Sequence, residues 1–544
     1  MKHIDIFIAN GLIIDGSLSE PFEGCIAISG DKISFIIKKN SAKNIFNADN
    51  FIDAEGMVIS PGFIDTHAHS EFTLLADPRA EAKVCQGITT EINGNCGLSA
   101  APLYGEAFEH RESDLKEYCI KERWHDFNEY FMLLKNREPA LNFLSLTGHG
   151  NIRASVIGYK NKKPDSLEMK KMQELLRKSF TEGSAGLSTG LIYPPGVYSD
   201  TEELIDLLNN SDVNSSKTGI YTSHIRSEGD HLIEAVEELI RIGEKTGVPV
   251  HISHIKTNGK ENWHKIDDVI SLIENARNNK IKITGDRYPY IASSTDLDTI
   301  LPSWAYEGGA KEELKRLKDS KIVKVLKQQI IDRHPEPEYW ENITVSSVVS
   351  EKNKWMEGKT ISHIANSRKL NPLDALIELL VEEKIRVGAI FTAMNEDNLK
   401  RFLSLPYIMI GTDSSARSFS GITFRGNPHP RGFGSFPKFV GKYVRDKSIM
   451  ELKEAIFKIT SLPSETFGLQ NRGLIKEGFY ADIVIFDYKK IHDNATFEKP
   501  FLKPSGIQYV FINGKPVLYE GKITGIRPGR ILKPIPKRLE NKNN

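Results

Sequence analysis

Two histidines spaced two residues apart, His67 and His69, end an apolar run that begins at Val58. On a β-strand, residues two apart face the same side, so both imidazoles would point to one place. Converging imidazoles are the natural first half of a metal site. An isolated His-x-His pair is more often a surface or packing feature, so this motif alone is a weak indication.

Three further β-type runs end in possible metal ligands: Tyr221-Thr-Ser-His224, His251-Ile-Ser-His254 and Ile408-Met-Ile-Gly-Thr-Asp413. If the second run stays a regular strand, His251 and His254 face opposite sides. A metal site at the carboxyl ends of the strands of a (β/α)₈ barrel needs ligands in such positions. Four endings of this kind favour a metal site over packing.

A cysteine, Cys96, ends the stretch Thr90-Glu-Ile-Asn-Gly-Asn-Cys-Gly97. A free cysteine is most often a small buried hydrophobe. The glycine-rich, polar surroundings here predict instead an exposed turn, where a thiolate beside imidazoles would bind zinc strongly. The other cysteines, Cys25, Cys85 and Cys119, lie in ordinary amphipathic contexts and are expected to be packing residues.

The elements that would position these residues alternate between short β-branched runs and helical stretches, which is typical of a parallel βα architecture. Helices are expected at 167–181, 202–210, 231–246 and 266–278. Strands are expected at 62–67, 88–93, 142–147, 185–188, 220–224, 249–255, 282–286, 389–393 and 407–412. Nine strands are one too many for an eight-stranded barrel, and the excess is expected near Ala389.

Outside this region, residues 1–60 and 470–530 read as short strands and turns, with Asn10-Gly11 and Gly30-Asp31 as hairpin signals. The fold class predicted is therefore α/β: a TIM-like (β/α)₈ barrel over 61–295 and 362–469, with a small β-sandwich formed by both termini. Residues 296–361 are rich in Lys and Glu and are expected to form a subdomain inserted on the barrel rim. Residues 531–544 are expected to be a tail.

Composition excludes several classes of protein. The 544 residues are 39% hydrophobic and 26% charged, with 72 basic residues balancing 72 acidic ones. That profile is globular, and a neutral chain gives no support for nucleic-acid or anionic membrane binding. No signal peptide or apolar run of the ~20 residues that span a bilayer is visible, so a cytoplasmic protein is expected.

The segment Pro61-Gly-Phe-Ile-Asp-Thr-His-Ala-His69 resembles the amidohydrolase superfamily, and other segments resemble its D-aminoacylase (N-acyl-D-amino-acid deacylase) branch. These are Gly94-Asn-Cys-Gly97, Leu187-Ser-Thr-Gly-Leu-Ile-Tyr-Pro-Pro-Gly196, Tyr288-Pro-Tyr290, Asn427-Pro-His-Pro-Arg431 and Thr460-Ser-Leu-Pro463. The resemblance extends over residues 5–530 and implies a barrel, a terminal β-sandwich and an insertion near the substrate site.

The resemblance implies one tight zinc bound by Cys96, His224 and His254, and a second, weaker position lined by His67, His69 and Asp413. Cys96 is the branch's substitute for a bridging carboxylated lysine. The segment Gly183-Ser-Ala-Gly-Leu-Ser-Thr-Gly190 contains no Lys or Glu, which agrees with that substitution and counts against hydantoinase- or dihydroorotase-like relatives.

The function implied is zinc-dependent hydrolysis of N-acyl-D-amino acids, small substrates with a free carboxylate. Asp413 would be the catalytic acid and base, and Arg431 would hold the carboxylate. Further substrate-binding residues implied are Lys256, Tyr288, Ser294 and Tyr193, with His149 as a neighbour and Arg425 as a second candidate for the carboxylate. The segment Ser414-Ser-Ala-Arg-Ser-Phe-Ser-Gly-Ile-Thr-Phe-Arg425 is longer than the family pattern, so it leaves the preferred side chain open.

Three other functions remain open. A dipeptidase for peptides with a C-terminal D-residue would present the same amide and carboxylate, and another amidohydrolase activity would use the same motifs. A catalytically silent scaffold is disfavoured, because it would have no reason to keep five ligands and Asp413.

Overall fold

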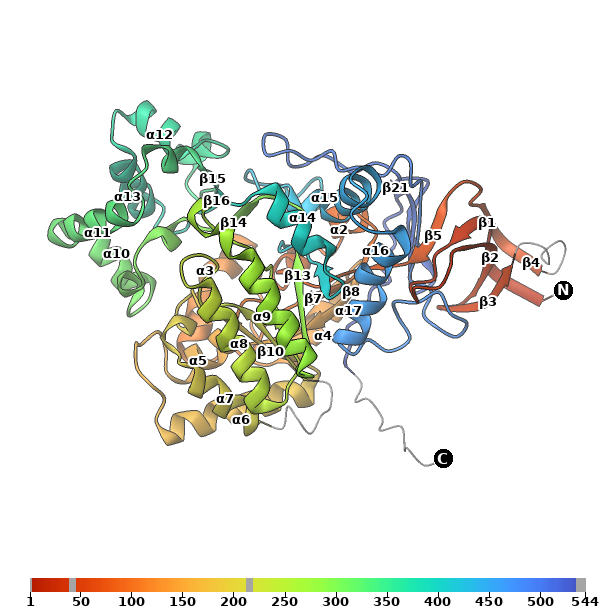
Figure 1. The fold of residues 1–544 in the computed structure, drawn as a ribbon, viewed down its shortest axis with the longest axis horizontal. Helices are drawn as coiled ribbons and strands as arrows, with labels where there is room; N and C mark the ends of the chain where they lie inside the picture. Colours follow the sequence, from red (N-terminus) through yellow and green to blue (C-terminus); the bar gives the residue numbers. More distant parts are fainter. Residues whose placement is uncertain (1, 39–45, 212–218, 535–544) are drawn as a thin grey trace.

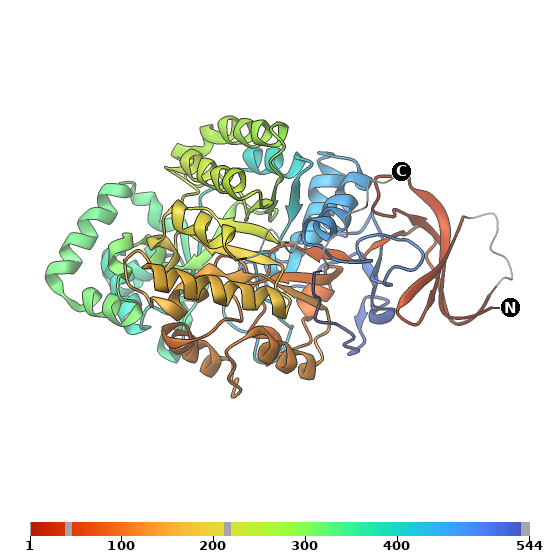
Figure 2. The same ribbon diagram turned by 90° about the horizontal axis from the view of Figure 1, so that it is seen from below.

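A computed structural model describes residues 2–38, 46–211 and 219–534 of the chain. It is an α/β structure in which parallel strands occupy the middle, a sheet built from both termini lies at one end, and a helical unit lies at the other (Figures 1 and 2). Of the described residues, none belongs to a helix long and apolar enough to cross a membrane.

Both termini contribute to one nine-stranded sheet, in which β5 and β18 pair antiparallel and join the two ends of the chain. Its strands are β1 (Lys2–Ile13), β2 (Phe22–Ser29), β3 (Lys32–Lys38), β4 (Phe46–Asp53), β5 (Val58–Pro61), β18 (Ile483–Phe486), β19 (Ile507–Ile512), β20 (Lys515–Tyr519) and β21 (Lys522–Ile523). Alternate isoleucines of these strands form a separate hydrophobic core.

The two hairpin signals near the N-terminus have different outcomes. Gly30-Asp31 joins β2 to β3 as expected, with Ser29 opposite Lys32. Asn10-Gly11 does not form a turn, because β1 continues through it with a bulge between Ile8 and Gly11. A bulge takes one extra residue into the strand, and Asn10 accordingly has φ 60°.

The middle of the molecule is made of parallel strands, which pair in the order in which they occur along the chain. They are β6 (Phe63–Asp65), β7 (Ile88–Asn93) and β8 (Asn142–Ser145) in one sheet, and β9 (Thr147–Gly148), β10 (Gly186–Gly190), β11 (Ile220–His224), β12 (Val250–Ile252), β13 (Ile283–Arg287) and β17 (Ile408–Ile410) in the other. The sheets meet twice: only Leu146 separates β8 from β9, and Ala68 bridges to Ser414 beyond β6 and β17.

The four expected helices are present as α6 (Ser166–Glu182), α7 (Thr201–Asn209), α8 (Leu232–Thr246) and α9 (Ile266–Asn278). Their boundaries follow local chemistry. The Asp165 side chain caps the first turn of α6, and α6 and α8 end at Gly183 and Gly247 in the left-handed conformation that glycine tolerates best. The apolar face of α8 is buried against the parallel strands.

The strand expected near Ala389 is β16 (Gly388–Thr392), and it lies outside the parallel sheets. It pairs antiparallel with β14 (Ala292–Asp296) and β15 (Ile343–Ser347). Four helices pack around this small sheet: α10 (Ala310–Lys318), α11 (Ser320–Arg333), α12 (Ile361–Arg368) and α13 (Pro372–Glu382). Their shared hydrophobic cluster extends from Leu297 to Ala389, so the packing continues past residue 361, where the insertion was expected to end.

The expected C-terminal tail begins later than residue 531. Ile531 bridges to Phe143 of β8, and Leu532 donates its backbone N–H to the Phe143 carbonyl oxygen at 2.7 Å. The last ten residues of the expected tail, 535–544, lie outside the described residues.

Candidate metal centre and active site

Three possible ligands lie just after strands, and each has a backbone φ angle in the left-handed region. Cys96, His254 and Asp413 have φ values of 54°, 37° and 48°. Positive φ is uncommon for residues other than glycine and gathers at functional sites, where the surrounding packing holds it. The turn that carries Cys96 is tight, since a Cβ on Gly94 would lie 2.2 Å from the Leu146 carbonyl oxygen. The cysteine is therefore buried, at 6% exposure, and the expectation of an exposed turn was wrong.

Cys96 lies at the centre of the candidate ligands. Its Sγ is 3.2 Å from His67 Nε2 and 3.4 Å from His254 Nε2. Three overlapping triplets have their donor atoms within 4.8 Å of one another: Cys96 with His224 and His254, Cys96 with His67 and His69, and Asp413 with His67 and His254. One thiol and four imidazoles thus converge as the sequence pattern predicts.

The chemistry of these donors fits a zinc ion. Both ring nitrogens of His224 are buried, and neither has a hydrogen-bond partner among the described residues, which is costly unless something else binds there. Burial would raise the pKa of the Cys96 thiol, but the neighbouring His67 and His254 hold that pKa well below its usual range. A thiolate with imidazoles is a donor set that zinc prefers.

A second group contains Asp413, whose Oδ1 lies 3.3 Å from His69 Nε2 and 3.7 Å from His67 Nε2. Burial would raise the pKa of Asp413, yet Arg431 and then His254 hold it well below its usual range. Asp413 is therefore an ionised carboxylate that can accept protons.

Sequence reasoning missed the residues that orient these ligands. Asp286 accepts from His67 Nδ1 at 3.2 Å, from His251 Nε2 at 2.8 Å and from the His254 backbone N–H at 2.8 Å. His251 is therefore a partner of Asp286 rather than a candidate ligand. Asp286 ends a predicted strand, so the rule that found the ligands could have found it too.

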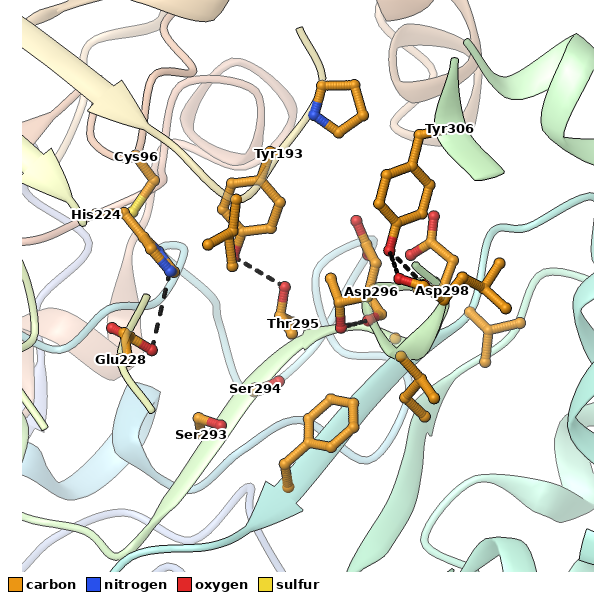
Figure 3. A pocket seen from close by; sticks show the side chains of 18 of the residues that line it. Cys96, Tyr193, His224, Glu228, Ser293, Ser294, Thr295, Asp296, Asp298 and Tyr306 are labelled. Atoms are coloured by element: carbon orange, nitrogen blue, oxygen red, sulfur yellow. Dashed lines mark hydrogen bonds and ion pairs between the residues drawn. The ribbon is translucent and has the colours of Figure 1, made fainter. Parts of the chain in front are cut away.

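Glu228 has the same role on the other side of the centre. Its Oε1 lies 2.9 Å from His254 Nδ1, and its other oxygen lies 3.8 Å from His224 Nε2 (Figure 3). Lys256 Nζ lies 2.8 Å from His254 Nδ1 and forms an ion pair with Glu228. Carboxylates that bind the far nitrogen of a histidine fix its tautomer and orientation for a metal. No strand-end pattern marks Glu228, which lies in a loop.

Beneath the centre, the wholly buried Lys83 connects the first and last parallel strands. Its Nζ lies 2.7 Å from Asp65, 2.8 Å from Glu91 and 2.8 Å from Thr412 Oγ1. Asp65 in turn accepts from the Thr412 backbone N–H at 2.8 Å. This network fixes the segment with His67 against the segment with Asp413.

The predicted carboxylate-binding residue, Arg431, begins α15 (Arg431–Lys438) and is 4% exposed. Its Nη1 lies 2.8 Å from Asp413 Oδ2, and Nη2 donates to the Ser294 carbonyl oxygen at 3.1 Å. Its guanidinium lies 4.6 Å from the centre of the Tyr288 ring. Arg425, the second candidate for the carboxylate, is instead paired with Glu117.

A cavity of about 2590 Å³ contains the predicted substrate-binding residues Tyr193, Lys256, Tyr288, Ser294 and Arg431 in its lining, together with Cys96, His224 and Asp413. Tyr193 packs edge-on against His224, and its hydroxyl lies 3.0 Å from Thr295 Oγ1 (Figure 3). His149 was expected beside this pocket but does not line it, because its Nε2 is buried against Glu203 at 3.0 Å. Of the other cysteines, Cys25 and Cys85 are buried and Cys119 is exposed.

A model described as "Amidohydrolase family" matches residues 50–518. D-aminoacylase of Alcaligenes xylosoxydans xylosoxydans is 33% identical over 97% of both chains, and N-acyl-D-glutamate deacylase of the same organism is 32% identical over 98% of this chain and 97% of that protein. A crystal structure of N-acyl-D-glutamate deacylase from Bordetella bronchiseptica, complexed with zinc and a phosphonate inhibitor, is 30% identical, with a TM-score of 0.81 over 98% of this chain and 100% of that one.

Proposed function

The chain belongs to the amidohydrolase family, and we propose that it hydrolyses the amide bond of N-acyl-D-amino acids to a carboxylic acid and a D-amino acid. The observation that carries this proposal is the convergence of Cys96, His224 and His254 next to the Asp413–Arg431 ion pair. A metal site, a proton acceptor and a carboxylate-binding group thus share one cavity.

We propose that the eight parallel strands, with β8 and β9 as one, form a (β/α)₈ barrel, which would place the site at the carboxyl ends of its strands. The backbone contacts between the two sheets support ring closure. The sheet of both termini, 1–60 with 470–530, would be the β-sandwich, and the unit around β14–β16 would be the insertion beside the substrate.

Cys96, His224 and His254 would hold a tight zinc ion, and His67, His69 and Asp413 would line a weaker position. When bound, zinc supplies Lewis-acid chemistry, which lowers the pKa of water toward about 7 and polarises a carbonyl. Asp413 accepts the proton of the attacking water on its carboxylate and delivers it to the leaving nitrogen. That delivery is needed because an amide anion is a very poor leaving group.

Arg431 binds the substrate α-carboxylate, with Lys256 and the Tyr288 hydroxyl as further donors in the lining of the same cavity. The Tyr288 hydroxyl is buried and has no hydrogen-bond partner in the described part of the chain, which leaves it free to donate to a substrate oxygen. Arg431 and Asp413 are 2.8 Å apart, so a carboxylate on Arg431 leaves the neighbouring amide nitrogen close to Asp413. With carboxylate, carbonyl and nitrogen all held, the two enantiomers send their side chains in different directions, so the enzyme is stereoselective.

The experiment compares release of D-amino acid from N-acetyl-D-leucine and N-acetyl-D-glutamate with release from the dipeptides glycyl-D-leucine and glycyl-D-glutamate, using zinc-loaded protein. Faster cleavage of an N-acetyl compound than of the dipeptide with the same D-residue supports the deacylase. Cleavage of the dipeptides alone would support the D-dipeptidase instead. If zinc-loaded protein cleaves none of the four, the proposed function is wrong.

A further inference from the structure

A second, smaller cavity of about 300 Å³ opens from the catalytic groups. It shares His69, Ser294, Asp413 and Arg431 with the large cavity. The rest of its wall comes from β15 and the segment after it, from Glu117 and Tyr118, and from residues within 414–417 and 425–429 that follow Asp413. Residues 414–425 are the segment that is longer than the family pattern.

All but one of the fixed charges in the lining of this smaller cavity have a partner of opposite charge. Asp413 pairs with Arg431, Lys354 pairs with Glu357 at 2.8 Å, and Glu117 pairs with both Arg425 and Arg386. The exception is Arg417, for which the described part of the chain offers no carboxylate within ion-pair distance.

Arg417 is half-buried, and among the described residues its guanidinium is held through one terminal nitrogen alone. Nη1 donates to the carbonyl oxygens of Thr423 at 3.2 Å and Arg425 at 3.0 Å. Burial lowers the pKa of Arg417, although the guanidinium remains charged at neutral pH. A partly desolvated charge without a counter-charge is costly, and an anionic ligand would offset that cost.

The far side of the large cavity carries a group of carboxyl side chains, and arginines such as Arg333 also belong to its lining. There Asp296 and Asp298 project from the segment that begins with β14 (Figure 3). Glu313 of α10 lies near them. The Glu313 side chain is buried, and no described residue forms a hydrogen bond with its Oε1. Burial raises the pKa of Asp298 to about 8 and that of Glu313 to about 9, so at neutral pH these two carboxyls are mostly protonated and neither attract nor strongly repel an anion.

We propose that Arg417 binds the side-chain carboxylate of the substrate, so that the enzyme prefers N-acyl-D-amino acids with an acidic side chain. This inference rests on the proposed function. It follows from the position of the amino acid: its α-carboxylate is on Arg431 and its nitrogen is near Asp413, and both residues line the smaller cavity. A side chain that leaves the carbon between those two groups can enter the cavity toward Arg417.

The test compares kcat/KM for two isosteric pairs, N-acetyl-D-glutamate with N-acetyl-D-glutamine and N-acetyl-D-aspartate with N-acetyl-D-asparagine. Wild type is expected to favour an acid over its amide. Arg417→Gln should reduce kcat/KM for that acid by about 10–150-fold, the usual effect of losing a charge-assisted contact, and change the amide by less than about threefold. Arg417→Lys keeps the charge without the planar fork and should retain part of the preference.

Arg79→Gln is the matched control. Arg79 Nη2 donates to the Ser420 carbonyl oxygen of the same segment at 2.7 Å, but Arg79 lines neither cavity. It should shift acid and amide equally. If Arg417→Gln also shifts both members of each pair equally, or wild type prefers neither acid, this inference is overturned. Hydrolysis of N-acetyl-D-leucine in that case would leave the proposed function standing, whereas zinc-loaded protein inactive on every substrate would remove both.

Discussion

Replacing Arg431 with alanine tests the binding of the substrate α-carboxylate. The guanidinium is buried. It forms an ion pair with Asp413 and a hydrogen bond to the Ser294 carbonyl oxygen, so its position is fixed before substrate binds. Loss of a charge-assisted bidentate contact costs about 1.5–3 kcal/mol, which corresponds to about 10–150-fold in kcat/KM. The assay compares N-acetyl-D-leucine with its α-carboxamide, which lacks the negative charge.

A large loss on the acid with a small loss on the carboxamide is the expected result. Equal losses on both would mean that Arg431 only supports the structure, and would refute the assignment. A second readout is the pH profile on the carboxamide. Arg431 is the strongest of the groups that hold the pKa of Asp413 down against burial. Asp413 works as the carboxylate, so in Arg431→Ala its raised pKa should move the acidic limb of kcat/KM to higher pH.

Three further substitutions separate the roles in the site. Cys96→Ala should remove most of the bound zinc together with activity, and full metal content in that variant would overturn the ligand assignment. Asp413→Asn should keep the tight zinc and lower kcat by at least the ~10²–10⁴-fold expected for acid–base catalysis; near-normal turnover would place proton transfer elsewhere. Glu228→Gln should weaken zinc binding by about 10–100-fold, measured by competition with a chelator, because Glu228 orients His254; unchanged affinity would contradict that role.

The candidate ligands could be predicted because strand periodicity and strand ends are local properties of the sequence. His67, Cys96, His224, His254 and Asp413 each follow a run of β-branched residues, and parallel strands bring their carboxyl ends together. Side-chain partners distant in sequence could not be predicted in this way. Lys83 looks like a surface residue of a short helix until the fold brings Asp65 and Glu91 to it.

The hydrophobic cluster around β14–β16 extends beyond the expected bounds 296–361, and the sequence does not show this for a related reason. Helix α13 has an apolar periodicity like that of the helices that cover the parallel strands, and α12 has only a weak one, so the sequence does not reveal which core they pack against. Only their contacts with β15 and α10 assign them to the insertion. The left-handed backbone conformation of Cys96 and His254 could not be predicted from the sequence either, because it depends on close packing around the turns rather than on residue type.

The most direct test of the central claim is a zinc titration of chelator-treated protein, with release of free amino acid measured from the D and L forms of N-acetyl-leucine and N-acetyl-glutamate. Activity on a D substrate is expected to return as zinc binds to Cys96, His224 and His254, and the L forms should be cleaved far more slowly. Protein that has bound zinc and releases no amino acid from either D substrate, or that cleaves both enantiomers equally, would contradict that claim.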